Sequence, residues 1–209
     1  MSDLARCICG VACVSFGIAV VQAQKSDSPA PAVENTCEAL FHAGRYEATF
    51  TSGPMFSPFL ATQNRPTINY TLSEFQLGYM LTDVKHSGWF RGNFQIAGEG
   101  FAGGVFEGEG GYVSGLTVWL RYNFVPKDWR VVPYAQAGMG LTFTDIDRNM
   151  VGETFNFNLD LGVGARCFIA HNWSVNLEYR YQHISNANIG RRNVGINAHG
   201  PMLGLSYFF

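Results

Sequence analysis

The chain has 209 residues, of which 14% are charged and 14% are aromatic, and its formal net charge is −2. This balance excludes the basic footprint of a nucleic-acid-binding protein, and the aromatic content excludes an intrinsically disordered chain. The mean hydropathy of +0.01 excludes a bundle of membrane helices. A chain of average hydropathy with 24 glycines and many aromatic residues is typical of a membrane β-barrel, whose lipid-facing and interior residues average out.

The N-terminal region predicts an export signal followed by a lead-in. Arg6 precedes an apolar run over residues 7–21, and small residues mark a cleavage position after Ala23. The run is shorter than the ~20 residues that a helix needs to span a bilayer. We therefore predict a signal peptide over residues 1–23 and a periplasmic lead-in over residues 24–45.

From residue 46 onward, apolar and polar residues alternate with a period of two, which is typical of β-strands that have two different faces. The segment 172–182 shows this most clearly, because all its odd positions are apolar or aromatic and all its even positions are polar. The apolar face is aromatic near the strand ends, as a membrane-interface girdle requires. Counting such segments predicts eight strands, at 46–53, 68–82, 87–98, 112–125, 130–143, 154–168, 172–184 and 199–209.

Eight strands predict an all-β fold, an eight-stranded antiparallel transmembrane β-barrel over residues 46–209, because an open sheet edge finds no hydrogen-bond partner in lipid. The predicted connections alternate in length, which is typical of outer-membrane barrels with short periplasmic turns and long outer loops. Short ones are predicted at 83–86, 126–129 and 169–171, and long ones at 54–67, 99–111, 144–153 and 185–198. The terminal Phe209 on an alternating last strand resembles the insertion signal of outer-membrane proteins. We therefore expect the bacterial outer membrane as the location.

The sharpest chemical motif is His-Ile-Ser-Asn-Ala at residues 183–187, at the end of the seventh predicted strand. Residues two apart in a strand share a face with Cα atoms ~6.5–7 Å apart, so an imidazole can reach a hydroxyl. His183 and Ser185 continue the apolar face of their strand, so we expect them to face the bilayer near the outer leaflet. There, His183 would take a proton from Ser185 as the serine attacks a lipid ester. The amides of Asn186 and Asn193 are nearby donors for the oxyanion.

Around this motif the chain resembles the PagL family of outer-membrane lipid A 3-O-deacylases, also known as acyloxyacyl hydrolase-like proteins. The match runs through Glu-Tyr-Arg-Tyr-Gln-His-Ile-Ser-Asn-Ala at 178–187 and Asn-Val-Gly-Ile-Asn at 193–197, with weaker similarity back to about residue 46. The resemblance implies a barrel with His183 and Ser185 on its exterior that hydrolyses an acyl ester of lipid A. It also implies that Asn186 and Asn193 help to form the oxyanion hole.

The sequence departs from this family at Asn197, where its best-studied members carry a glutamate. An amide can accept a hydrogen bond from the imidazole and fix its tautomer, but it stabilises imidazolium less well than a carboxylate does. Three interpretations stay open: a weaker enzyme, a substitute carboxylate from Asp145, Asp147 or Glu153, or a protein that is not a hydrolase.

The leading prediction is an outer-membrane serine esterase that removes a 3-O-linked acyl chain from lipid A, with lipopolysaccharide as its partner. The alternative is a non-enzymatic small barrel that binds lipopolysaccharide or stabilises the membrane. A porin is disfavoured because eight strands leave no aqueous channel.

Polar side chains on the other face of the strands are predicted to form a charge network that fills the interior: Arg121, Asp160, Arg166, Glu178 and Arg180. The scattered histidines give no zinc-site spacing, so we predict neither a metal nor a cofactor. The sequence leaves open whether Cys37 and Cys167 pair, and whether the protein forms a homodimer.

Overall fold

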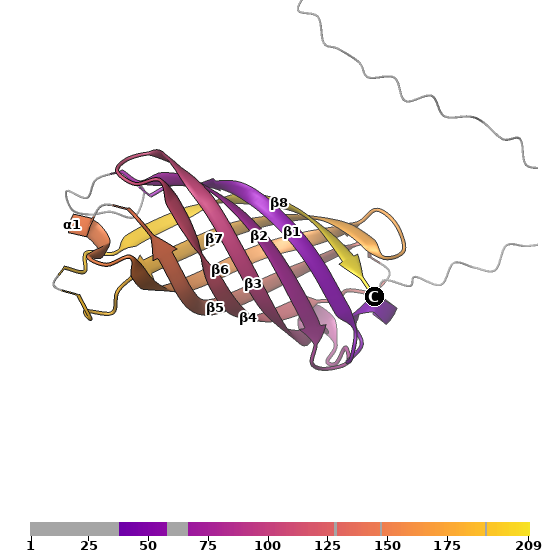
Figure 1. The fold of residues 1–209 in the computed structure, drawn as a ribbon. Coiled ribbons are helices and arrows are strands. Elements are labelled where there is room, and N and C mark those ends of the chain that lie inside the picture. Colours follow the sequence, from indigo (N-terminus) through magenta and orange to yellow (C-terminus); the bar gives the residue numbers. More distant parts are fainter. Residues whose placement is uncertain (1–37, 58–66, 128, 147, 191) are drawn as a thin grey trace, which may run out of the picture. The chain divides into compact units, whose positions relative to one another are not determined.

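The computed structural model describes residues 38–57, 67–127, 129–146, 148–190 and 192–209. Within them, eight antiparallel strands form a closed barrel in which each strand pairs with the next and β1 pairs with β8 (Figure 1). The strands are β1 (Tyr46–Met55), β2 (Asn69–Met80), β3 (Gly92–Glu107), β4 (Tyr112–Phe124), β5 (Val131–Thr144), β6 (Phe155–Phe168), β7 (Trp173–Ser185) and β8 (Ile196–Phe208). This confirms the predicted fold. The predicted signal peptide, Cys37 and Asp147 lie outside the described residues.

The two ends of the barrel differ. The β1–β2, β3–β4, β5–β6 and β7–β8 connections lie at one end, together with the short helix α1 (Arg148–Val151), and we call this the α1 end. The C-terminus lies at the opposite end, which we call the terminal end (Figure 1). Among the described residues, no helix is both long and apolar enough to cross a membrane.

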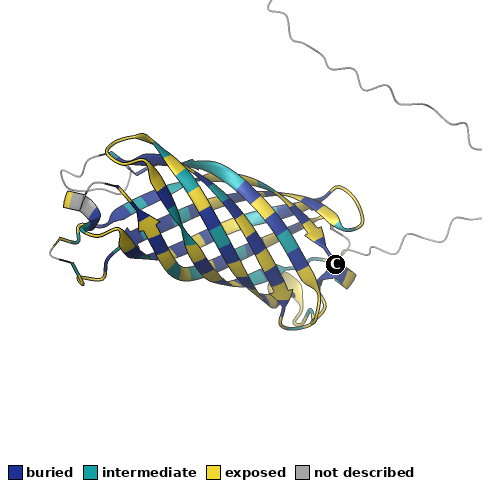
Figure 2. Ribbon diagram, in the orientation of Figure 1, coloured by how far each residue is buried: buried dark blue, intermediate teal, exposed yellow. Residues whose placement is uncertain are grey.

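Side chains alternate between the two faces of the barrel wall, as the bands in Figure 2 show. On β7 the even-numbered residues are buried, whereas the odd-numbered ones are exposed or half-buried. Leu177, for example, is 61% exposed, whereas the guanidinium-bearing Arg180 is fully buried. Apolar residues on the outside and charged residues on the inside reverse the arrangement of a water-soluble barrel. The outer wall is therefore built for an apolar medium.

Ion pairs fill the middle of the barrel. Glu47 accepts hydrogen bonds from Arg166 Nε at 2.7 Å and from Arg121 Nη1 at 3.2 Å. Arg180 Nε donates to Glu178 Oε1 at 2.7 Å. Burying an ion costs several kcal/mol, and these ion pairs offset part of that cost. They confirm the predicted interior network, whose five predicted members are all buried.

Apolar clusters close the interior on both sides of this network. The cluster toward the α1 end includes Met55, Ile146 and Ile184. The cluster at the terminal end is completed by Leu40 and Phe41 of the 3-10 helix η1 (Glu38–Phe41), so this part of the predicted lead-in packs into the barrel.

The predicted connections were partly wrong. The glycine-rich segment that follows residue 98 was predicted as a loop because glycine is typical of loops, but most of it belongs to β3. The segment 99–111, predicted as a long loop, is largely strand, and only residues 108–111 connect β3 to β4. Gly103 needs its lack of a side chain here, since a Cβ would lie 1.8 Å from the Thr71 carbonyl oxygen on β2. In the other direction, the start of the third predicted strand is the 3-10 helix η3 (Gly88–Phe90), so the β2–β3 connection is longer than predicted.

Candidate active site

His183 and Ser185 are the last two outward positions of β7, and both side chains are half-buried. Ile184 between them points inward and is fully buried in the apolar cluster at the α1 end. Because one strand carries all three residues, the packing of Ile184 fixes the backbone from which the imidazole and the hydroxyl project. The two polar groups therefore lie on the outer wall at the α1 end.

Asn197 holds the imidazole of His183. The two residues are directly opposite in the β7–β8 ladder, and His183 Nδ1 lies 2.6 Å from Asn197 Oδ1. The same oxygen accepts a hydrogen bond from the Tyr181 hydroxyl at 2.9 Å. The amide oxygen of Asn197 thus contacts two side chains of β7. Its contact with the imidazole engages Nδ1, one of the two ring nitrogens.

Gly195 lies beside both polar groups and has a positive φ of 72°. A Cβ at this position would lie 3.2 Å from His183 Cε1 and 3.5 Å from Ser185 Cβ. The imidazole and the serine therefore both approach the space that the missing side chain leaves. Glycine suits this position for two reasons: it tolerates the left-handed backbone, and it has no side chain to crowd His183 and Ser185.

Asn186 has both of its amide hydrogens engaged within the loops. Its Nδ2 donates to the carbonyl oxygens of Val151 and Arg192, each at 2.7 Å, and its side chain is almost fully buried. These bonds tie the β7–β8 connection to helix α1. Sequence reasoning did not identify this contact, because it joins two loops far apart in the chain.

Asn193 is less constrained than Asn186. Its Oδ1 accepts the backbone N–H of Asn186 at 3.0 Å, and its Nδ2 donates to Asn188 Oδ1 at 3.1 Å. Ala187 and Asn188 both have positive φ, which is costly for residues other than glycine and is typical of functional loops. The two asparagines thus hold a strained turn directly after Ser185.

Two of the three predicted substitute carboxylates, Asp145 and Glu153, lie within the described residues, and no hydrogen bond joins either side chain to His183. Asp145 accepts the backbone N–H groups of Gly111 at 2.7 Å and Tyr112 at 2.9 Å, and these bonds lower the pKa of its carboxyl below the usual value. Glu153 lies near Gly190, at a position where a Cβ on the glycine would meet its side chain. Within the described part of the chain, Asn197 is the residue that contacts His183 Nδ1.

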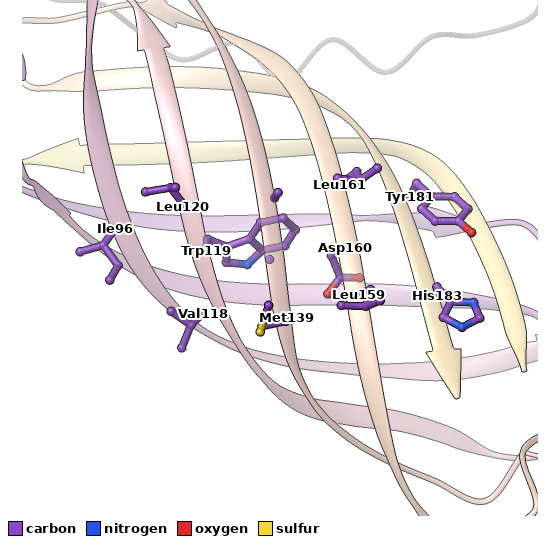
Figure 3. A pocket seen from close by; sticks show the side chains of 12 residues that line it. Ile96, Val118, Trp119, Leu120, Met139, Leu159, Asp160, Leu161, Tyr181 and His183 are labelled. Atoms are coloured by element: carbon purple, nitrogen blue, oxygen red, sulfur yellow. The ribbon is translucent and has the colours of Figure 1, made fainter. Parts of the chain in front are cut away.

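An apolar groove with a volume of about 910 Å³ runs along the outer wall to His183. Figure 3 shows Ile96 at one end and His183 and Tyr181 at the other. Small residues of β5, Ala137 and Gly138, lie between larger residues of the neighbouring strands, which include Val118, Leu120, Leu159 and Leu161. This groove was not predicted from the sequence. The feature of the sequence that could have indicated the groove is the pair of small residues in β5, which lies between two strands with larger apolar residues.

No group of three or more His, Cys, Asp or Glu residues in the described ranges is arranged to hold a metal ion. The side chains that the structure places together at this site are an imidazole, a hydroxyl and several amides beside an apolar groove.

A family model for lipid A 3-O-deacylases (PagL) matches residues 19–206. The crystal structure of the outer membrane enzyme PagL matches with a TM-score of 0.55 at 16% identity, over 76% of this chain and 98% of that chain. The crystal structure of Neisserial surface protein A (NspA) matches with a TM-score of 0.54 at 14% identity, over 80% of this chain and 98% of that chain. At such identities the structural likeness establishes the fold. A search of curated proteins found no match.

Proposed function

The chain belongs to the lipid A 3-O-deacylase (PagL) family of the bacterial outer membrane, and we propose that it removes a 3-O-linked acyl chain from lipid A at His183 and Ser185. The observation that carries this assignment is the hydrogen bond between His183 Nδ1 and Asn197 Oδ1 on the outer wall. It orients an imidazole beside a serine at the end of an apolar groove.

The proposed reaction follows from the tautomer that this hydrogen bond selects. With Nδ1 protonated and donating to Asn197, Nε2 carries the lone pair that can accept a proton. Nε2 takes the proton of Ser185 Oγ as the oxygen attacks the ester carbonyl carbon. The tetrahedral intermediate then expels the sugar hydroxyl, which receives the proton from the imidazolium. Water, deprotonated by the same nitrogen, releases the fatty acid from Ser185.

The Ser185 hydroxyl is expected to turn toward the imidazole when substrate binds. Over the described residues, no hydrogen bond joins these two side chains. Catalytic hydrogen bonds are often long or misaligned without substrate and tighten in the bound complex.

Of the two amides predicted for the oxyanion hole, we favour Asn193. Both amide hydrogens of Asn186 are engaged by backbone carbonyls, so donation to an oxyanion would break a loop contact. The Nδ2 of Asn193 donates one hydrogen to Asn188 Oδ1, and its second hydrogen can be donated to the substrate. We therefore assign Asn186 to the support of the loop and Asn193 to the tetrahedral intermediate.

The groove is the proposed binding site of the acyl chain. A lipid tail that moves from the bilayer into the groove exchanges one apolar environment for another, so the hydrophobic effect contributes little affinity. The groove instead supplies orientation, because its end at His183 places the ester of a seated chain beside the catalytic pair. If the terminal end faces the periplasm, this site lies at the outer leaflet.

The amide of Asn197 stabilises an imidazolium less than a carboxylate would, so we expect a slower enzyme than one with glutamate at this position. The test is to express the chain in a host with hexa-acylated lipid A and to weigh the lipid A by mass spectrometry. A loss of one hydroxyacyl chain is expected, and Ser185→Ala and His183→Ala should abolish it. Unchanged lipid A mass with a folded wild-type barrel, or full activity of Ser185→Ala, would refute the proposal and favour the non-enzymatic barrel.

A further inference from the structure

We propose that Tyr181 is a positioning residue that fixes the amide orientation of Asn197, so that the oxygen and not the nitrogen faces His183. This inference rests on the proposed function, because it concerns the tautomer that the reaction needs. It starts from one observation: Asn197 Oδ1 lies within hydrogen-bond distance of both His183 Nδ1 and the Tyr181 hydroxyl.

A terminal amide has two ends of similar shape and opposite hydrogen-bonding character. If the amide of Asn197 rotated by half a turn, its nitrogen would donate to His183 Nδ1. The proton of the neutral imidazole would then have to lie on Nε2, and His183 could not accept the proton of Ser185. A carboxylate has no such inactive orientation, because both of its oxygens are acceptors. An asparagine at this position therefore needs a third group that distinguishes its two ends.

Tyr181 is placed to be that group. It lies on β7 two residues before His183 and on the same outward face, so the two side chains approach Asn197 from one strand. A phenol hydroxyl donates hydrogen bonds more readily than it accepts them, because its oxygen lone pair is partly delocalised into the ring. When the Tyr181 hydroxyl faces the amide oxygen of Asn197, it donates a hydrogen bond, as a phenol prefers. If it faced the amide nitrogen, it would have to accept a hydrogen bond from that nitrogen. The apolar outer wall strengthens the difference, since little water competes for either bond.

The first test is a double-mutant cycle on initial rates of lipid A deacylation in detergent micelles. Tyr181→Phe should lower kcat about tenfold with little change in KM, since it removes one hydrogen bond that discriminates the two amide orientations. In an Asn197→Asp background, where the amide is replaced by a carboxylate of the same shape, Tyr181→Phe should change kcat less than about twofold. Tyr179→Phe is the matched control, because that hydroxyl lies on the same face but contacts His199 Nδ1.

Equal losses from Tyr181→Phe in both backgrounds would overturn the inference, because a general packing defect does not depend on the chemistry of residue 197. Unchanged kcat in the Asn197 background would overturn it as well. A wild-type protein that leaves lipid A intact, or a Ser185→Ala variant that still cleaves it, would instead refute the proposed function.

The second test does not require activity. Nitrogen-15 NMR of imidazole-labelled protein, recorded on the neutral imidazole, reports which nitrogen of His183 carries the proton. His183→Gln assigns the signal. The wild type should show the Nδ1–H tautomer, and Tyr181→Phe should show a mixture with the Nε2–H tautomer. Identical tautomer populations in the two proteins would overturn the inference whatever the activity measurements give.

Discussion

Replacing Gly195 with alanine should slow the reaction at the proposed site while leaving the barrel folded. The new Cβ would lie 3.2 Å from His183 Cε1 and 3.1 Å from the Ile184 carbonyl oxygen, both tighter than ordinary van der Waals contact. The Ile184 backbone is fixed by the ladder and by its buried side chain, so the imidazole has to move. A shift of a few tenths of an ångström is enough to relieve the contact.

Two effects should follow from this substitution, and they have different sizes. The positive φ of 72° at Gly195 strains any residue with a Cβ, by roughly 1–2 kcal/mol of folding free energy. The displaced imidazole weakens its hydrogen bond to Asn197 and its approach to Ser185. Because a 1 Å misplacement of a catalytic group can lower a rate about a hundredfold, we expect a decrease in kcat of about tenfold.

Gly44→Ala is the matched control, since Gly44 also has a positive φ, of 91°, but nothing lies within 4 Å of its Cβ position. It should lose comparable stability and keep full activity. Initial rates of lipid A deacylation and urea unfolding of both variants in the same detergent make the comparison. Equal, undiminished kcat values for the two variants would refute the argument that Gly195 makes room for His183.

Three further predictions concern neighbouring groups. Asn197→Glu should raise kcat severalfold by stabilising the imidazolium, measured as the initial rate of acyl release, and a lower rate would show that the longer side chain displaces His183. Asn186→Ala should lower the midpoint of thermal unfolding of the α1 end, because it removes three side-chain hydrogen bonds, with Val151, Arg192 and Asn188, each worth about 1 kcal/mol. Asn193→Ala should lower kcat about a hundredfold with a smaller loss of stability. The reverse pattern would reverse the roles that we assign to the two amides. The pKa of Asp145 is lowered in the folded state, so its carboxylate stabilises the β3–β4 turn above the unfolded pKa, and this support is lost as the pH falls through the folded pKa. Amide exchange at Gly111 should therefore be faster in Asp145→Asn than in wild type at pH 7, and the difference should vanish in strong acid.

The outward position of His183 and Ser185 could be predicted from the sequence because it depends only on the alternation within one strand. An orienting residue at Asn197 was expected only from the family resemblance. Strand alternation alone does not give its contact with His183, because that contact depends on the register between β7 and β8. The sequence predicted that the last strand starts at residue 199, whereas β8 starts at Ile196. With the predicted start, Asn197 belongs to a loop and has no partner across the ladder.

The β7–β8 register depends on the turn that joins the strands. Ala187 and Asn188 have positive φ there, and no sequence pattern marks an alanine for that conformation. The contact of Asn186 with Val151 was hidden for a similar reason, since its partner lies in a different loop, 35 residues earlier in the chain. Contacts within a strand were therefore predictable, whereas contacts that depend on loops were not.

The groove that ends at His183 is partly open toward the outside of the barrel, so protein atoms line the inner side of anything that lies in it. The opposite side consists of whatever hydrocarbon surrounds the barrel. If the proposed reaction takes place here, the surrounding amphiphiles form part of the substrate's environment, and rates measured in two detergents compare two different environments. The environment of the groove in the cell is therefore best reproduced in a bilayer of native composition.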